Sequence, residues 1–341
     1  MLSPDLRDVF AARKTISGVV SRTPLVPSPY LSSIIGQQLL FKLELTQPIG
    51  AFKLRGAVNA IFNLTGDING VTCCSTGNHG RGVAYAAKAR GIRAVICMSK
   101  LVPQTKIDGI KALGAEVRIV GDSQGDALVE SNRLVEEEGL TEISPFDDPY
   151  VIAGQGTIGL EMIEQNPELS MVVVPLSGGG LAGGIAVAVK RISPSIHVVG
   201  VSMDRGAAMY QSLEAGKPVE VKEYSSLADS LGGGIGMDNR FSFDLCRNYI
   251  DDVVLVSEQE IYRAMQTIYF EDRIVCEGGS AVGVAALLEG RIPAPKGPVA
   301  TVLSGRNIDM EIFTKIVSGE SLVLGDYLVE GRQYERSVSP D

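Results

Sequence analysis

At 341 residues, of which 45% are hydrophobic, the chain is longer than most single-core domains and has enough apolar content for two cores. A net charge of −9, with dispersed basic residues, argues against a nucleic-acid partner. No apolar run reaches membrane-spanning length, and two histidines leave little scope for a histidine-rich metal site. We therefore expect a soluble, globular protein of two domains.

The N-terminal residues 3–10 are typical of a capped amphipathic helix and differ from an export signal, so we expect a cytoplasmic protein. The five cysteines form no C-x-x-C pair, and most lie in apolar, strand-like runs. This pattern predicts buried thiols and no disulfide framework.

Lys53 lies in the largely apolar segment 47–57, after a strand-like run and before a helix-like pattern. A lysine in apolar surroundings loses basicity, and its amine becomes a nucleophile that can form a Schiff base with an aldehyde cofactor. Taken alone, however, the segment fits a solvated lysine at a helix start better.

Apolar β-type runs alternate with helical patterns, which predicts parallel β-α-β units and an α/β fold. The predicted strands are residues 70–74, 94–98, 116–120, 171–175, 197–201 and 299–303, and the predicted helices are 84–90, 107–113 and 185–190. We expect two open α/β layers with ligands at the carboxyl ends of the strands.

One glycine-rich loop follows the predicted strand 171–175 and opens a helix. Its residues are Ser177, Gly178, Gly179, Gly180 and Leu181. Glycine lets the backbone approach an anion closely, and a helix N-terminus supplies N–H groups with a favourable dipole. We interpret the loop as a phosphate site, with a merely tight turn as the alternative. It lacks the Lys-Ser/Thr of a P-loop, which disfavours a nucleoside triphosphate.

Two polar loops also follow predicted strands. In the first, Ser75, Thr76 and Asn78 offer hydroxyl and amide groups that suit a carboxylate and a phenolic oxygen, while His79 has a structural or a catalytic role. In the second, Ser304 could offer a neutral hydroxyl to a ring nitrogen, although an isolated Ser-Gly turn is often only a turn.

The order of five motifs resembles the pyridoxal-phosphate enzymes of the tryptophan-synthase-β fold type, and within them the threonine/serine dehydratases and serine racemase. The motifs are the Lys53 segment, the Ser75 loop, residues 145–157, the Ser177 loop and the Ser304 turn. The resemblance covers roughly residues 5–318. It implies two open, twisted, parallel-sheet domains with helices on both faces, an active site in the cleft between them, and a homodimer. The implied division is a large domain of residues 1–50 and 150–320, a small domain of 51–149 and a C-terminal appendage of 321–341.

The resemblance also implies the cofactor, pyridoxal 5′-phosphate, with Lys53 as the Schiff-base residue that later moves the Cα proton. The implied cofactor-binding residues are Phe52, Lys53, Asn78, Ser177, Gly178, Gly179, Gly180, Leu181, Glu277 and Ser304. Asn78 would bond the phenolic oxygen, and Ser304 would face the pyridine nitrogen. For Glu277, a solvated loop carboxylate is an equal alternative. The implied substrate-binding residues are Ser75, Thr76 and His79, around the substrate carboxylate.

A hydroxyl opposite the pyridine nitrogen would not hold that nitrogen protonated, which favours quick loss of a β-substituent over a long-lived carbanion. We therefore expect a dehydratase that eliminates water from a small β-hydroxy amino acid, such as L-threonine or L-serine, to give a 2-oxo acid and ammonia. Serine racemases carry a second serine at the position of Thr76, so racemisation is the less favoured alternative.

Three further features refine this hypothesis. Ser202 and Ala208 stand where metal-binding relatives carry carboxylates, so we expect no metal site. Residues 202–209 and 303–307 resemble a branch associated with hydroxyectoine breakdown, which keeps a hydroxyectoine-derived or 3-hydroxyaspartate substrate as an alternative. An NAD-dependent dehydrogenase is disfavoured, because the strand 94–98 is not followed by an acidic residue for a ribose.

Overall fold

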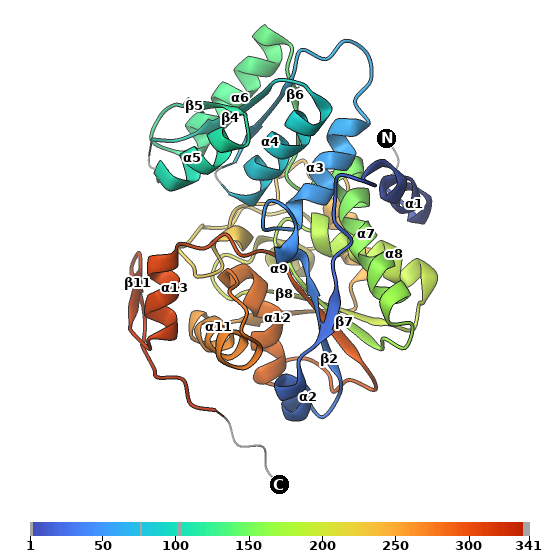
Figure 1. Cartoon of the computed structure of the whole chain (residues 1–341), viewed down its shortest axis with the longest axis vertical. Coiled ribbons are helices and arrows are strands. Elements are labelled where there is room, and N and C mark those ends of the chain that lie inside the picture. The colour runs from blue at the N-terminus through green and yellow to red at the C-terminus, as the bar shows by residue number, and fades with distance from the viewer. Residues whose placement is uncertain (1–2, 76, 101, 103, 337–341) are drawn as a thin grey trace.

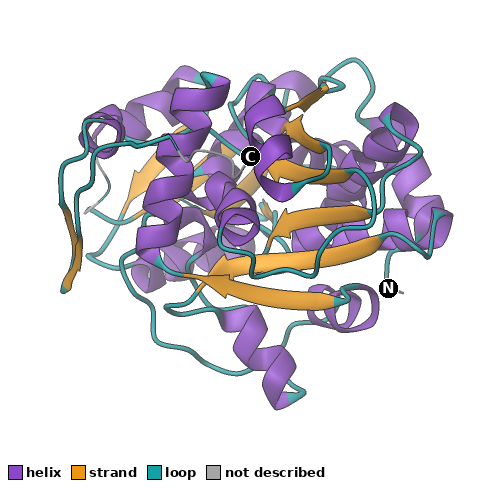
Figure 2. Ribbon diagram, turned by 90° about the horizontal axis from the view of Figure 1, so that it is seen from below, coloured by secondary structure: helices purple, strands orange, loops and turns teal. Residues whose placement is uncertain are grey.

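The computed structural model describes residues 3–75, 77–100, 102 and 104–336, and two sheets organise this part of the chain (Figure 1, Figure 2). The larger sheet has the order β1 (Leu25–Pro27), β2 (Leu39–Leu43), β10 (Val299–Leu303), β7 (Met171–Pro175), β8 (His197–Met203) and β9 (Asp252–Val256). Its pairs are parallel apart from β1 with β2. The smaller, fully parallel sheet has the order β5 (Glu116–Ile119), β4 (Ala94–Met98), β3 (Val71–Cys74) and β6 (Thr141–Glu142).

Helices cover both faces of each sheet, which confirms the predicted fold class. Around the larger sheet lie α2 (Pro29–Ile35), α7 (Pro149–Gln165), α8 (Gly180–Ile192), α9 (Ala208–Ala215), α10 (Ser242–Tyr249), α11 (Glu258–Asp272), α12 (Gly278–Leu288) and α13 (Met310–Val317). Around the smaller sheet lie α3 (Lys53–Phe62), α4 (Asn78–Arg90), α5 (Gln104–Ala112) and α6 (Gln124–Glu138). Helix α1 (Leu6–Thr15) packs on α7.

Successive residues of β7 face opposite cores of the larger sheet. Val173 packs in the core that contains Tyr262 of α11 and Val282 of α12, while Val172 packs in the core that contains Ile158 of α7 and Ile185 of α8. Side chains alternate across a strand, so a strand covered on both faces needs an unbroken apolar run. The all-apolar sequence of β7 therefore places it at the centre of the fold.

Helix α3 lies between the two sheets. Leu54 and Val58 belong to the core of the smaller sheet. On its other side, an added Cβ at Gly56 would lie 2.4 Å from Nε2 of Gln155 and 2.9 Å from the carbonyl oxygen of Val151, both on α7. Glycine therefore allows α3 and α7 to approach closely, across the boundary between the two predicted domains. The domain division stays a prediction.

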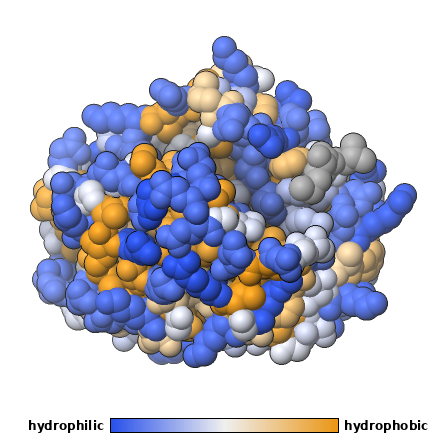
Figure 3. Space-filling model, turned by 90° about the horizontal axis from the view of Figure 1, so that it is seen from above, coloured by the Kyte–Doolittle hydropathy of each residue, from blue (hydrophilic) through white to orange (hydrophobic). Residues whose placement is uncertain are grey.

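The last described residues form an antiparallel hairpin of β11 (Leu322–Leu324) and β12 (Tyr327–Val329), and Leu322 and Val329 are buried in the core of the larger sheet. Seen from the end where the smaller sheet lies, the surface is mostly hydrophilic, with apolar patches between (Figure 3). On α6 at that end, Leu128 and Val129 are exposed. Within the described residues, no helix combines the length and apolar content that a bilayer-spanning segment needs.

We expect Gly56→Ala to lower the stability of the protein by about 1–3 kcal/mol, because the methyl group would force α3 and α7 apart. The measurement is the midpoint of urea unfolding. Gly125→Ala in α6 is the matched control, because its added Cβ would meet only Oγ of Ser123, at 3.5 Å. A Gly56→Ala protein as stable as the wild type would contradict the close packing.

Candidate active site

Lys53 is the first residue of α3, and its position is fixed by the end of β10. The backbone N–H of Phe52 donates to the carbonyl oxygen of Ser304 at 2.9 Å. Ala51 pairs with Gly305 in an isolated antiparallel bridge. These backbone contacts hold the start of α3 beside the loop that contains Ser304.

The Lys53 side chain is partly buried beside the segment 145–146. Its Nζ donates to the carbonyl oxygen of Pro145 at 2.6 Å and lies 5.3 Å from the ring centre of Phe52. Within the described residues, no carboxylate forms an ion pair with it. Burial lowers its pKa from 10.5 to about 8. A substantial fraction of the amine is therefore neutral, and hence nucleophilic, in mildly alkaline solution.

The segment Pro145–Phe146 links Lys53 to the glycine loop. An added Cβ at Gly178 would lie 2.4 Å from the Phe146 ring, and one at Gly180 would lie 2.8 Å from the Phe146 backbone. Any larger residue at these two positions would collide with Phe146. The loop and the Lys53 amine therefore contact the same short segment.

The glycine loop ends β7 and begins α8. Gly179 precedes the helix with φ of +87°, a left-handed conformation that favours glycine. Among the residues that the structure describes, no side chain caps this helix start. Its first N–H groups and the helix dipole can therefore bind an anion. Ser177 and Gly178 precede this helix start, and Leu181 lies buried in its first turn.

Two neutral hydroxyl groups lie at the end of β10. Oγ of Ser304 and Oγ of Ser280 are buried and 3.1 Å apart. Oγ of Ser280 also accepts from the N–H of Gly305 and donates to its carbonyl oxygen, both at 2.7 Å. Ser280 therefore fixes the turn that holds Ser304. Because Ser280 donates its one hydrogen to Gly305, Ser304 donates to Ser280 in this structure, and its hydroxyl would turn to donate to a ring nitrogen. A neutral donor of this kind would not keep that nitrogen protonated.

Asn78, at the start of α4, contacts residues that belong to the larger-sheet half of the molecule. Its Nδ2 donates to Oε1 of Glu277 at 2.8 Å, and its Oδ1 accepts from Nδ2 of Asn307 at 2.6 Å. Nδ2 of Asn307 also donates to the carbonyl oxygen of Ile49 at 2.9 Å. Because that carbonyl can only accept, the orientation of both amides is set. One N–H of Asn78 remains for a ligand oxygen.

Glu277 carries a buried carboxyl group and occupies the position just before α12, although its side chain does not cap that helix. Its side chain accepts from Asn78 and, through Oε2, from the backbone N–H of Asn307 at 3.1 Å. Burial raises its pKa from 4.5 to about 7. Only 5% of the residue is exposed, so the alternative of a solvated loop carboxylate is wrong.

The predicted substrate-binding residues follow β3. Ser75 is half-buried, and Thr76 lies outside the described residues. His79 is buried, and its Nε2 donates to the carbonyl oxygen of Ile143 at 2.7 Å. Burial, together with the charge of Lys53, lowers the pKa of His79 to about 3, so the ring is neutral. Its contact with a substrate carboxylate stays a prediction.

Known proteins that are similar to this chain support the interpretation of the site as a cofactor site. Residues 16–305 match the family described as "Pyridoxal-phosphate dependent enzyme". The chain belongs to this family. The family match also confirms pyridoxal 5′-phosphate as the predicted cofactor.

Three relatives illustrate the similarity. A Sinorhizobium fredii protein, provisionally named threonine dehydratase, is 55% identical over 316 residues, which are 92% of this chain and 95% of that protein. The L-threonine ammonia-lyase of Thermotoga maritima is 39% identical over 92% of this chain and 78% of its own length. The structure of maize serine racemase superposes with a TM-score of 0.87 at 34% identity, covering 92% of this chain and 97% of that one.

The residues present fit the cofactor. The start of α8, which has no side-chain cap among the described residues and follows Gly179 in the left-handed conformation, leaves backbone N–H groups free for the phosphate. Lys53 supplies an amine for the aldehyde, Asn78 an N–H for the phenolic oxygen and Ser304 a hydroxyl for the ring nitrogen. All four groups lie at the carboxyl ends of strands or in the loops that follow them.

Of the two positions expected to lack metal ligands, Ser202 is a buried residue near the end of β8 and Ala208 begins α9. In the segment that joins these elements, the Arg205 guanidinium lies 4.8 and 4.5 Å from the ring centres of Tyr224 and Tyr327. Among the described residues, no group of three or more acidic, histidine or cysteine side chains is arranged to hold a metal. The absence of a metal site stays a prediction.

Sequence reasoning missed the roles of Ser280, Asn307 and Phe146. Asn307 follows Ser304 in the same turn, and Phe146 lies in a motif that was recognised without a role. Ser280 follows Glu277 by three residues, the spacing that places both at a helix start. Their contacts join segments far apart in the chain, so no local pattern reveals them.

We expect the rate at which the cofactor-free protein forms a Schiff base with pyridoxal phosphate to rise with pH and level off above about 8. Burial disfavours the charged amine, so the neutral nucleophile predominates above the lowered pKa of Lys53, and not only above 10.5. The measurement is the initial rate at which the visible absorption band of the Schiff base appears, from about pH 6 to about pH 10. Rates that keep rising to the alkaline limit would contradict the burial of the amine.

We expect Asn307→Ala to weaken cofactor binding roughly tenfold, because the Asn78 amide would lose the donor that orients it. Titration of the cofactor-free protein with pyridoxal phosphate measures the dissociation constant. Asn69→Ala removes the same group from an exposed residue and should leave the constant unchanged. Equal affinity of Asn307→Ala and wild type would show that Asn78 needs no such support.

Proposed function

We propose that the chain is a pyridoxal-phosphate dependent ammonia-lyase that converts L-threonine, and also L-serine, to a 2-oxo acid and ammonia. One observation carries the proposal: the Lys53 amine, with its lowered pKa, donates to the segment 145–146 that packs on the uncapped glycine loop, and its helix starts beside the Ser304 loop. The relatives named threonine dehydratase and L-threonine ammonia-lyase support the same activity.

When bound, pyridoxal phosphate supplies an aldehyde that joins the substrate amine and withdraws electrons from its Cα. The N–H groups around Gly179 hold the phosphate. The Lys53 amine, once neutral, accepts the Cα proton, and its low pKa suits a base near neutral pH. Ser304 would donate to the ring nitrogen of the bound cofactor without charging it, and a cofactor held in this way would favour departure of the β-hydroxyl group as water. The overall change is L-threonine to 2-oxobutanoate and ammonia.

The loop that contains Ser75 supplies the pocket for the substrate carboxylate. The first N–H groups of α4 have no side-chain cap among the described residues, so they can bind an anion together with the Ser75 hydroxyl. His79 stays neutral beside this loop and shapes the pocket without adding charge. Thr76 belongs to the same proposed pocket.

Serine racemisation is the second candidate, because maize serine racemase superposes closely on this chain. The hydroxyectoine-derived and 3-hydroxyaspartate substrates are further candidates. Assays of 2-oxo acid release from L-threonine, L-serine and threo-3-hydroxyaspartate, with chiral analysis of unreacted serine, distinguish these activities. Faster racemisation than 2-oxo acid release would favour the racemase.

We also propose a cytoplasmic homodimer. The described cysteines form no disulfide, and Cys73, Cys97, Cys246 and Cys276 are buried, as expected of a protein from a reducing compartment. The dimer is supported by the family resemblance. Light scattering of the purified protein measures its mass in solution.

We expect Lys53→Ala to lower kcat for L-threonine by roughly 10³-fold or more, because both the Schiff-base amine and the Cα base are lost. Release of 2-oxobutanoate measures the rate. Lys88→Ala, at an exposed lysine of α4, is the control and should keep wild-type activity. Undiminished activity of Lys53→Ala would refute the proposed function.

A further inference from the structure

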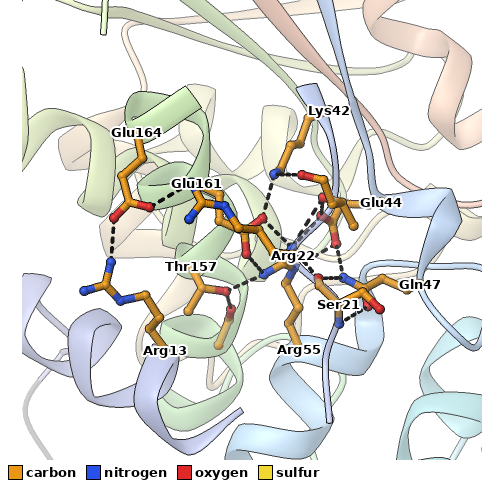
Figure 4. A network of polar contacts seen from close by, with 12 residues as sticks. Arg13, Ser21, Arg22, Lys42, Glu44, Gln47, Arg55, Thr157, Glu161 and Glu164 are labelled. Carbon is orange, nitrogen blue, oxygen red and sulfur yellow. Dashed lines mark hydrogen bonds and ion pairs between the residues drawn. The ribbon is translucent and has the colours of Figure 1, made fainter. Parts of the chain in front are cut away.

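A buried network of charged side chains adjoins the helix that begins at Lys53 (Figure 4). Its centre is Arg55, which is fully buried. Nε and Nη2 of Arg55 donate to the two carboxylate oxygens of Glu44, both at 2.8 Å. Nη1 and Nη2 donate to the two oxygens of Glu161, at 2.7 and 2.9 Å. Each of the two carboxylates thus accepts hydrogen bonds from the one guanidinium through both of its oxygens.

The two carboxylates come from different elements of the larger-sheet half. Glu44 begins the short 3-10 helix η1 (Glu44–Thr46) that follows β2, and Glu161 lies in α7. Lys42 of β2 completes the network, because its Nζ donates to Oε2 of Glu161 at 2.6 Å and to the carbonyl oxygen of Thr23 at 2.7 Å. The network contains two cations and two anions, so its net charge is zero.

Burial of such a network contributes little net stability compared with apolar side chains of the same volume. Its geometry, however, is highly directional. The other contacts between α3 and α7 include close backbone approaches, such as Gly154, whose added Cβ would lie 2.6 Å from the carbonyl oxygen of Arg55. Towards the far end of α3, Nδ2 of Asn59 also donates to the carbonyl oxygen of Tyr150 at 2.7 Å. Close contacts at glycine residues restrict the rotation of α3 about its axis only weakly. The paired hydrogen bonds of the Arg55 guanidinium with Glu44 and Glu161 restrict that rotation strongly.

We propose that Arg55 is a positioning residue that acts through Lys53: the Glu44 and Glu161 carboxylates fix the first turn of α3, and thereby the direction of the Lys53 amine. The inference rests on the proposed function in so far as Lys53 is the reactive amine. Because the network is neutral, its effect on Lys53 is geometric. A displacement of a reacting group by about 1 Å can reduce a rate roughly 100-fold.

The test uses Arg55→Lys, which keeps the charge but loses the planar fork. The first measurement is the rate at which the visible band appears when pyridoxal phosphate is added to cofactor-free protein, with borohydride reduction to verify the Schiff base. We expect this rate to fall roughly tenfold or more, with an unshifted pH midpoint of the band. In the holoenzyme, kcat for L-threonine should fall by a similar factor while KM changes less than about threefold.

Lys42→Gln is the matched control, because it removes a charge from the same network without touching α3. Both variants should lower the melting temperature, but Lys42→Gln should keep the rate of band formation and kcat within about twofold of wild type. Two results would overturn the inference in favour of a merely structural role. The first is an equal fall of the rate of band formation and of kcat in both variants, and the second is wild-type values of both in Arg55→Lys.

If Arg55→Lys does not fold, Glu44→Gln takes its place, because glutamine still accepts one N–H from Arg55 and Glu161 keeps both of its contacts with the guanidinium. The network then carries one net positive charge, so the pH midpoint of the band is recorded together with the rate. The rate of band formation of this variant should fall about threefold or more, and an unchanged rate would overturn the inference. Wild-type protein that forms the band but leaves L-threonine unchanged would refute the proposed function. The rates of band formation would still decide the role of Arg55.

Discussion

The burial of the Lys53 amine, with no carboxylate partner among the described residues, is the constraint on which the rest of the site depends. Burial lowers the pKa of this amine to about 8, and its partner is a carbonyl oxygen of Pro145 instead of a carboxylate. An acidic partner would raise the pKa and keep the amine charged. The groups around it follow the same requirement: Ser304 and Ser280 are neutral, His79 is held neutral, and burial raises the pKa of Glu277 to about 7.

The parallel sheets explain how these groups come together. In parallel strands, the carboxyl ends lie at one edge of each sheet, and the loops that follow them meet there. The Lys53 segment follows β2, the Asn78 loop follows β3, the glycine loop follows β7 and the Ser304 turn follows β10. The contacts of Asn78 with Glu277 and Asn307 then join the segment after β3, in the smaller sheet, to the start of α12 and to the turn after β10.

Much of this arrangement could be predicted from the sequence, because the strands of a doubly covered sheet are continuous apolar runs. The predicted strands 94–98, 171–175 and 299–303 coincide with β4, β7 and β10. Strand β9, at the edge of the larger sheet, was not predicted, although residues 253–256 are an apolar run. The buried network around Arg55 was also missed, because the partners of Arg55 are distant in sequence. From the local sequence alone, a charged residue such as Arg55 is expected to be exposed to solvent.

The central claim is that Lys53 is the lysine that binds the cofactor. The most direct test is borohydride reduction of the purified holoenzyme, followed by proteolysis and peptide mass spectrometry. The account predicts a pyridoxyl group on the peptide that contains Lys53, and on no other lysine. A pyridoxyl group on a different lysine, or none in a protein that shows the visible band, would contradict it.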